Sequence, residues 1–293
     1  MNAKFKIVIS MMVFGTLGIF VKNIPLSSGE IALYRAIIAA ISIILYQLLS
    51  DKRIRLREIK KDLPLLFLSG AAMGFNWILL FQAYHYTTVS LATLSYYFAP
   101  VIITIACPIL FKERMTIKQI FCFIMSTVGL ILIINIGGAG NPNHNIIGIL
   151  LGLGAASFYA SVVILNKFIK NVTGIDRTLL QFFAAIIVLT PYVYITSGFH
   201  PASAGTVGIL NLFLIGIVHT AITYCMYFSS LKDLKGQEAA ILSYIDPLVA
   251  IIVSITILQE SISFLQIVGG FMILGFTLLN ELKLAPSKVH KTI

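Results

Sequence analysis

Asp246 has the clearest potential for chemistry in this sequence, because it is a carboxyl group inside a long apolar run. It lies eight residues beyond Glu238, about 12 Å further along a helix. A charged group in apolar surroundings is costly unless it has a partner. The following Pro247 removes a backbone donor, so we expect the helix to kink where Asp246 lies. We interpret Asp246 as a proton-titrating group or as the counter-charge of an ammonium group; a structural acid held by hydroxyl groups is the alternative.

Three further ionisable residues lie in or beside apolar runs. His219 titrates near neutral pH, so with Asp246 it could form a proton relay; a hydrogen-bonded core histidine is the alternative. Arg35 follows Glu30 by five residues. We expect Arg35 to pair with Glu30 or, less favoured, with a carboxylate of a bound molecule.

Aromatic residues with polar tips, and one amide, lie at a similar depth in their runs. Such rings can stack on a small molecule or hold a cation over their faces, although packing alone accounts for many buried rings. With Asp246 and His219, the predicted central cavity comprises Asn76, Trp77, Tyr96, Tyr97, Tyr159, Tyr227 and Tyr244.

The elements that must position these residues are apolar helices. Of the 293 residues, 58% are hydrophobic and 11% are charged, whereas a soluble protein carries about 25% charged residues. The composition therefore excludes an ordinary soluble enzyme, a disordered chain and a disulfide scaffold. A membrane-spanning helix needs about 20 apolar residues. Runs of this kind lie near 5–21, 29–49, 63–83, 89–111, 116–134, 146–166, 178–197, 206–230, 237–258 and 262–282. They predict an all-α membrane protein with ten transmembrane helices.

Lysine and arginine are distributed unequally between the predicted loops. With the N-terminus in the cytoplasm, nineteen of the 21 basic residues fall in cytoplasmic segments. The outer loops around 84–88, 135–145, 198–205 and 259–263 contain none. This bias is the positive-inside pattern of membrane proteins. It predicts a multi-pass protein with both termini in the cytoplasm, in a bacterial inner or plasma membrane.

The two halves of the chain align weakly when one is shifted by 147 residues. The shift brings Phe81, Ala92, Tyr97, Pro100, Glu113 and Gln119 onto Phe228, Ala239, Tyr244, Pro247, Glu260 and Gln266. Each half holds five predicted helices, an odd number, so the two copies cross the membrane in opposite senses. The predicted units are 4–135 and 146–283, followed by a cytoplasmic tail at 284–293. Such inverted repeats favour alternating access to a site between them.

Charged residues at the ends of the predicted helices receive a structural interpretation. Glu113 and Glu260 precede Thr116 and Ser263, and we expect these acids to cap the helices that follow them. Lys22 ends the first predicted helix, from which its ammonium group can reach the membrane interface.

A family resemblance covers nearly the whole chain. It rests on Phe81, Ser90, Ala92, Pro100, Glu113, Gln119 and Gly129, on Ala239, Pro247, Glu260, Gln266 and Gly269 in the second copy, and on Lys22 and Arg35. In these residues the chain resembles the EamA-like branch of the drug/metabolite transporter superfamily. The resemblance implies ten helices and the activity of a secondary carrier, in many members an exporter of amino acids. Ala99 stands where the second copy has Asp246, so the chemistry of the two halves is expected to differ.

These observations predict a secondary active transporter of small metabolites, with amino-acid export favoured and proton coupling through Asp246. An organic-cation transporter for choline or a drug is the first alternative, and a lipid-handling membrane enzyme or flippase is the second. The sequence contains no P-loop, HExxH or GxSxG motif. We therefore expect no enzymatic activity, cofactor, metal site or nucleic-acid partner. The expected partners are a small-molecule substrate, the lipid bilayer and protons; a monomer and a homodimer both remain open.

Overall fold

The computed structural model describes residues 2–49, 59–111, 116–134, 142–169, 171–172, 174–231 and 242–282. Over these residues the chain forms helices and no strands. Six helical segments are long and apolar enough to cross a membrane, and four shorter apolar helices accompany them. The protein is therefore an all-helical membrane protein.

The first half of the chain contains two interrupted helices. Its elements are α1 (Ala3–Gly15), α2 (Leu17–Lys22), α3 (Ser28–Leu49), α5 (Leu63–Tyr86), α6 (Val89–Tyr96), α7 (Ala99–Phe111) and α8 (Ile117–Ile134). Thr16 separates α1 from α2, and its hydroxyl donates a hydrogen bond to the carbonyl of Val13 at 2.8 Å. Tyr97 and Phe98 separate α6 from α7. Pro100 is the second residue of α7, a position where its missing N–H leaves no helical hydrogen bond unmade.

The second half contains a π-helical segment and one further interruption. Its elements are α9 (Pro142–Phe168), α10 (Gly174–Thr196), the short 3₁₀ helix η1 (Pro201–Ala204), α11 (Gly205–Phe213), the π-helix η2 (Leu214–Ile222), α12 (Thr223–Leu231), α14 (Ile245–Thr256) and α15 (Phe264–Glu281). α14 begins directly after a turn at Tyr244, three residues before Pro247. The irregularity expected at Asp246 is thus a helix break at Tyr244, with Asp246 and Pro247 in the first turn of α14.

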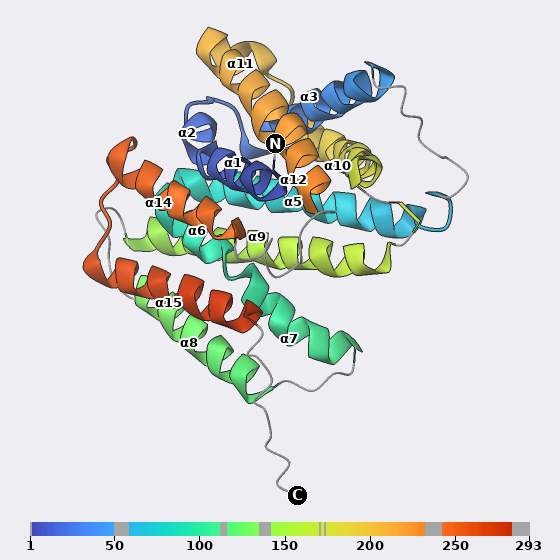
Figure 1. Cartoon of the computed structure of the whole chain (residues 1–293). Coiled ribbons are helices and arrows are strands. Elements are labelled where there is room, and N and C mark those ends of the chain that lie inside the picture. The colour runs from blue at the N-terminus through green and yellow to red at the C-terminus, as the bar shows by residue number, and fades with distance from the viewer. Residues whose placement is uncertain are drawn as a thin grey trace, which may run out of the picture.

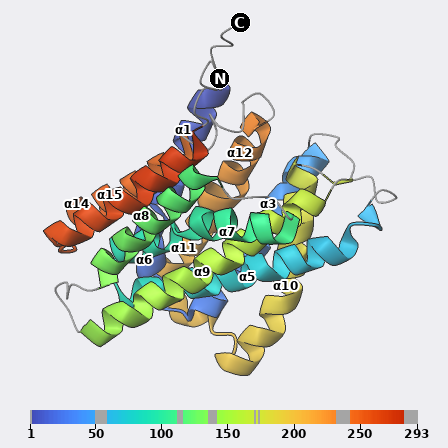
Figure 2. The same cartoon turned by 90° about the horizontal axis from the view of Figure 1, so that it is seen from below.

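Long helices run through the middle of the molecule, and smaller groups flank them (Figures 1 and 2). α5 packs along α9, and α10 packs against both α5 and α3. α8 and α15 lie side by side at the end of the molecule away from α3 and α10. α1 contacts α12 and α14. The largest core cluster includes Ile31, Phe81 and Phe182, all of which are fully buried.

α5 and α10 approach so closely at Gly70 that a side chain has no room there. A Cβ atom at this position would lie 2.4 Å from the carbonyl oxygen of Gln181 and 2.6 Å from the Cβ of Ala184. We expect Gly70→Ala to lower the free energy of unfolding by about 1–3 kcal/mol, because the two backbones must separate. Thermal unfolding of the purified protein measures this. Gly275→Ala is the control, since nothing lies within 4 Å of a Cβ at that position. Equal stability of the two variants would contradict the expectation.

Candidate functional site

The site centres on Asp246, in the first turn of α14. Its Oδ2 accepts a hydrogen bond of 2.7 Å from the hydroxyl of Tyr97, the residue that directly follows α6. Both partners therefore lie at interruptions of helices, and the N-terminus of α14 favours an anion at this place. α1 approaches the same point, because a Cβ at Gly15 would lie 2.6 Å from the carbonyl oxygen of Asp246.

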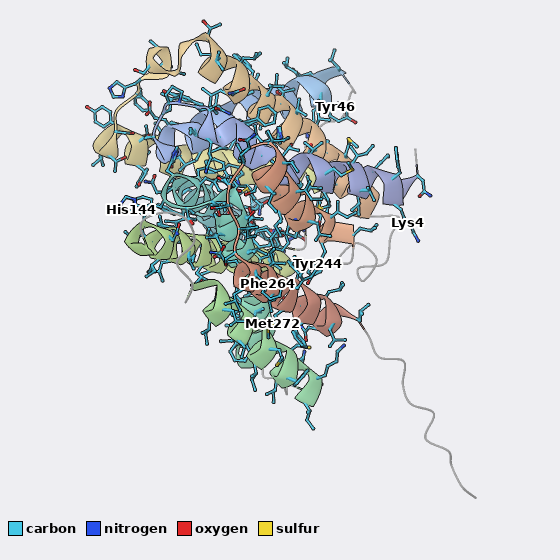
Figure 3. All side chains as sticks on the ribbon, turned by 90° about the vertical axis from the view of Figure 1, so that its left-hand side faces the viewer. Lys4, Tyr46, His144, Tyr244, Phe264 and Met272 are labelled. Carbon is cyan, nitrogen blue, oxygen red and sulfur yellow. The ribbon has the colours of Figure 1, made fainter. Side chains whose placement is uncertain are left out.

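Tyrosine side chains from several helices surround the Asp246 carboxylate. The ring centroids of Tyr96 and Tyr159 are 5.5 Å apart, and those of Tyr97 and Tyr244 are 6.4 Å apart. Asp246, Tyr96 and Tyr97 are half-buried, and Tyr159 is 40% exposed although its ring lies against Tyr96. The tyrosines thus form one cluster with the Asp246 carboxylate. Figure 3 places Tyr244 toward the middle of the molecule, away from Lys4 and His144.

Most of the predicted cavity residues belong to this region, and two tyrosines were missed. Tyr227 is an electrostatic neighbour of Tyr159. The Asn76 amide donates a 2.6 Å hydrogen bond to the carbonyl of Ala155, which joins α5 to α9. Tyr84 and Tyr224 were not predicted, yet both interact electrostatically with Asp246. Tyr224 precedes Tyr227 by three residues, so helical spacing could have found it.

Arg35 does not form the predicted pair with Glu30. Its Nε donates a hydrogen bond of 2.6 Å to the Oγ1 of Thr220. The guanidinium carbon lies 4.8 Å from the ring centroid of Trp77 and 5.6 Å from that of Phe81. The expected pairing was wrong because residues five positions apart point in different directions around a helix of 3.6 residues per turn. Trp77 thus lies beside Arg35, and the ring centroids of Trp77 and Phe182 are 5.6 Å apart.

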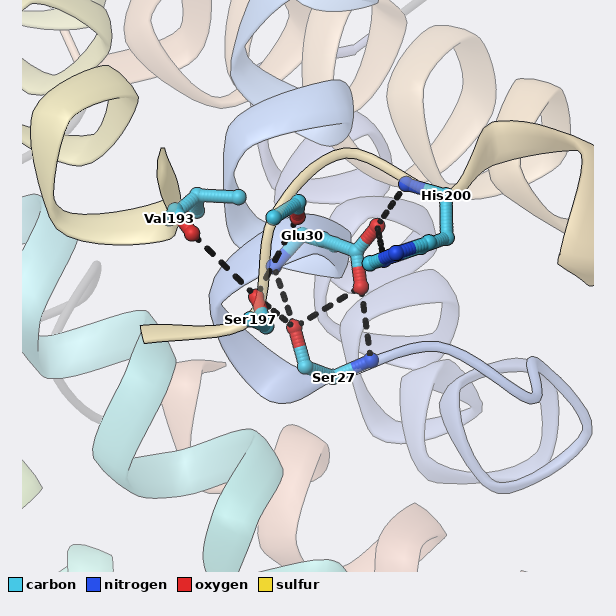
Figure 4. A network of polar contacts seen from close by, with 6 residues as sticks. Ser27, Glu30, Val193, Ser197 and His200 are labelled. Atoms are coloured by element: carbon cyan, nitrogen blue, oxygen red, sulfur yellow. Dashed lines mark hydrogen bonds and ion pairs between the residues drawn. The ribbon is translucent and has the colours of Figure 1, made fainter. Parts of the chain in front are cut away.

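Glu30 is held by groups at the start of α3 and after α10 (Figure 4). Its carboxylate accepts hydrogen bonds from the backbone N–H of His200 at 2.7 Å and from the hydroxyl of Ser27 at 3.0 Å. The Nδ1 of His200 lies 3.9 Å from the same carboxylate. Glu30 is therefore a buried acid that fastens a loop, and these contacts account for it without Arg35.

Among the residues that the structure describes, His219 contacts neither Asp246 nor another acid. Its Nε2 lies 3.0 Å from the hydroxyl of Thr16, and its Nδ1 lies 3.4 Å from the carbonyl oxygen of Leu214. Its ring packs edge-on against Phe20 at 4.9 Å. The structure thus gives no direct link for the predicted relay between His219 and Asp246, because the imidazole points toward the break between α1 and α2.

Glu260 has a different role from the predicted one. Ser263 and Gln266 cap α15 by themselves through reciprocal hydrogen bonds. Glu260 instead forms an ion pair with Lys22 at the end of α2 and accepts a hydrogen bond of 2.8 Å from the N–H of Val89 at the start of α6. Lys22 is thereby ion-paired. Glu113, the acid predicted to act likewise in the first half, lies outside the described residues.

Known proteins share both the sequence and the fold of this chain. The EamA-like transporter family matches residues 2–135 and again residues 146–281. An uncharacterized transporter of Bacillus subtilis (strain 168), YxxF, is 30% identical over 252 residues, which cover 86% of this chain and 80% of that protein. An uncharacterized transporter of Archaeoglobus fulgidus is 26% identical over 278 residues, 93% of this chain and 94% of its own length.

The structural comparison agrees with the sequence comparison on the fold. A solved crystal structure superposes with a TM-score of 0.65 at 14% identity, covering 94% of this chain and 96% of the other. The apolar helices, the polar cluster between them and the two sequence matches lead to one assignment. The chain belongs to the EamA-like transporter family and is a membrane transporter.

Proposed function

We propose that the protein is a secondary active transporter that moves small amine-bearing metabolites, amino acids first among them, out of the cell. The observation that carries this proposal is the Asp246 carboxylate, held by Tyr97 between two interrupted helices. In transporters, discontinuous helices build the substrate and ion sites near the middle of the membrane. An acid at such a place serves as the counter-charge of an ammonium group or as a proton carrier.

The transport cycle that we propose is alternating access between two inverted repeats of five helices each. Tyr97 and Tyr244 are 147 residues apart, the shift that aligns the two halves, and each lies at a helix interruption. The family also matches the chain twice, once in each proposed unit, 4–135 and 146–283. Equivalent breaks in two copies support a symmetric pair of conformations that open the centre to one side and then to the other.

The proposed orientation has both termini in the cytoplasm of a bacterial cell and ten membrane crossings. It is supported by the nineteen basic residues that fall on one side in this arrangement. It is also consistent with Figure 3, where Lys4 and Tyr46 lie toward one side of the molecule and His144 lies toward the other.

Proton coupling follows if the substrate and a proton compete for the same carboxylate. Asp246 can then carry a proton in one direction and exchange it for a substrate ammonium in the other. The tyrosines around Asp246 favour a second candidate, an organic cation such as choline, because aromatic faces attract quaternary ammonium groups. Tyr96, Tyr97 and Tyr159 provide such faces.

Flux in proteoliposomes tests the proposed function. We expect saturable exchange of labelled amino acids, accelerated by a proton gradient that drives solute out of the compartment corresponding to the cytoplasm. Saturable exchange of choline in place of amino acids would select the second candidate. Absence of flux for both classes, or chemical conversion of the solute, would contradict the proposal; empty liposomes and the Asp246→Asn protein are the controls.

A further inference from the structure

Arg35 carries a buried positive charge that no carboxylate of the described residues balances. Its side chain is 2% exposed, and an arginine stays protonated in proteins. The side chains that interact with it electrostatically are Tyr84, Tyr96 and Tyr224, and no acid is among them. Tyrosine hydroxyls are neutral at physiological pH. An uncompensated buried charge is strongly destabilising, so this position calls for a negative partner from outside the chain.

The groups that contact the Arg35 guanidinium occupy only part of it. The hydroxyl of Thr220 donates a hydrogen bond of 2.6 Å to the carbonyl of Ile215, and its oxygen accepts one of 2.6 Å from the Arg35 Nε. The rings of Trp77 and Phe81 lie 4.8 Å and 5.6 Å from the guanidinium carbon. A guanidinium has five N–H donors, of which the Nε–H is one. The four N–H groups of the two Nη atoms therefore have no hydrogen-bond partner within the described ranges of the chain.

The two Nη atoms of Arg35 also retain accessible surface. Some side-chain atoms of the described residues are both fully enclosed and without a hydrogen-bond partner, those of Ser90, Thr93 and Ser126 among them. The Nη atoms lack a partner as well, but they are not among these enclosed atoms. A small ligand can therefore touch them. A water molecule there would satisfy N–H groups but leave the charge unbalanced, whereas an anion does both.

The surroundings of Arg35 suit an anion in two further ways. The hydroxyls of Tyr84 and Tyr96 can donate hydrogen bonds to a negative ligand as well as accept them. Thr220 lies in the π-helix η2, and π-helical turns are rare and occur frequently at functional sites. Because Thr220 bonds to Nε alone, it fixes the orientation of the guanidinium and leaves the Nη atoms available to a ligand.

We propose that Arg35 is the centre of a binding site for a small inorganic anion, for which chloride is the natural probe. The Nη groups hold the anion, Thr220 orients the guanidinium, and the rings of Trp77 and Phe81 lie against it. This site goes beyond the proposed function, because it balances a charge inside the helix bundle and requires no particular cargo. The carboxylate of an organic acid carries the same negative charge, and the experiment distinguishes it from the inorganic ion.

Trp77 reports directly on this site. It is the only tryptophan of the chain, and its ring centroid lies 4.8 Å from the guanidinium carbon of Arg35. Bromide quenches tryptophan fluorescence on contact, so the purified protein is titrated with sodium bromide against sodium gluconate at constant ionic strength. We expect quenching that saturates and that chloride relieves by competition. Chloride in place of gluconate should also raise the Tm by about 2–4 °C, because a ligand of the folded state stabilises it.

Two variants separate the charge of Arg35 from general effects of salt. Arg35→Gln keeps a hydrogen-bonding side chain but removes the charge, so it should lose both the saturable quenching and the rise in Tm with chloride. Arg177→Gln is the matched control, since Arg177 bonds to the backbone carbonyls of Val172 and Ile169. This control should respond to bromide and chloride as the unaltered protein does.

Three outcomes overturn the inference, and the first needs no variant to fold. It is bromide quenching of the unaltered protein that rises without saturation or that chloride does not relieve. The second is a folded Arg35→Gln protein that keeps saturable quenching. The third is relief of quenching by acetate and not by chloride, which would assign Arg35 to a carboxylate. None of these measurements records transport, so the proposed function stands or fails separately, by flux in proteoliposomes.

Discussion

Asp246→Asn is expected to abolish proton-coupled exchange while leaving the protein folded and inserted in the membrane. Asparagine has nearly the same shape and can still accept the hydrogen bond from Tyr97, but it carries no charge. Removing one partner of a buried charge pair costs about 2–5 kcal/mol, so we expect a loss of affinity for amine-bearing substrates of roughly 100-fold. Exchange measured between about pH 5 and pH 8 should also lose its dependence on pH, because the carboxylate is the proposed proton carrier.

Two controls separate the charge of Asp246 from its packing. Asp176→Asn removes an acid at the start of α10, where it bonds to Gln47 away from the tyrosine cluster, and should leave exchange intact. Tyr97→Phe keeps the Asp246 carboxylate but removes the hydroxyl that donates a hydrogen bond to it. In this variant the substrate should bind the carboxylate without displacing the Tyr97 hydroxyl. The other titratable groups near Asp246 are Tyr84, Tyr96, Tyr159 and Tyr224. Unchanged flux and pH dependence in a folded Asp246→Asn protein would remove Asp246 from the mechanism.

The helical architecture could be predicted from the sequence, because it depends on local chemistry. Apolar runs specify where helices form, and Pro247 marks the interruption before α14, since proline cannot donate to the preceding turn. The depth of Tyr96, Tyr97 and Tyr244 in the membrane stays a prediction, counted along their apolar runs at the constant rise per residue of a helix.

The direction in which each side chain points could not be predicted in the same way. The partners of Arg35 and His219 are Thr220 and Thr16, which come from segments distant in the chain. Such contacts depend on how each helix is rotated against its neighbours, which a single sequence does not specify. The π-helix η2 adds to the difficulty, because one wide turn rotates every residue after it.

Glu260 shows how a local signal leads to a wrong assignment. It lies three residues before Ser263, so capping of the following helix was the natural expectation. In the structure, Gln259 adopts a left-handed conformation with φ of 51°, a region that residues other than glycine rarely occupy. This turn directs Glu260 back across the molecule. One carboxylate then joins Lys22 of α2, the N–H of Val89 in α6 and the hydroxyl of Ser254 in α14.

Removing the Glu260 carboxylate is expected to open the face of the protein at which α2, α6 and α14 meet. Three separate helices meet at one side chain, so a conformation in which they move apart must break all three contacts. Glu260→Ala removes every contact and should lower the free energy of unfolding by about 2 kcal/mol. This is the sum of two losses: the acceptor for the N–H of Val89 at the start of α6, and the ion pair with Lys22. Glu260→Gln and Lys22→Met remove the ion pair alone and should cost about half as much, because the glutamine oxygen can still accept from Val89.

Cysteine labelling at Ser90 distinguishes an opened face from mere destabilisation. Ser90 follows Val89 in α6, is 1% exposed, and its hydroxyl has no hydrogen-bond partner among the described residues, so Ser90→Cys substitutes a similar atom at little cost. With the native cysteines replaced by alanine, a membrane-impermeant thiol reagent should react slowly while Glu260 is present and several times faster in Glu260→Ala. The exchanged pair Lys22→Glu with Glu260→Lys restores opposite charges but offers no acceptor to Val89, so it should slow labelling only in part. Equal labelling rates in all three backgrounds would mean that the Glu260 contacts do not hold α2, α6 and α14 together, since loss of a carboxylate that joins these helices should expose the residue beside it.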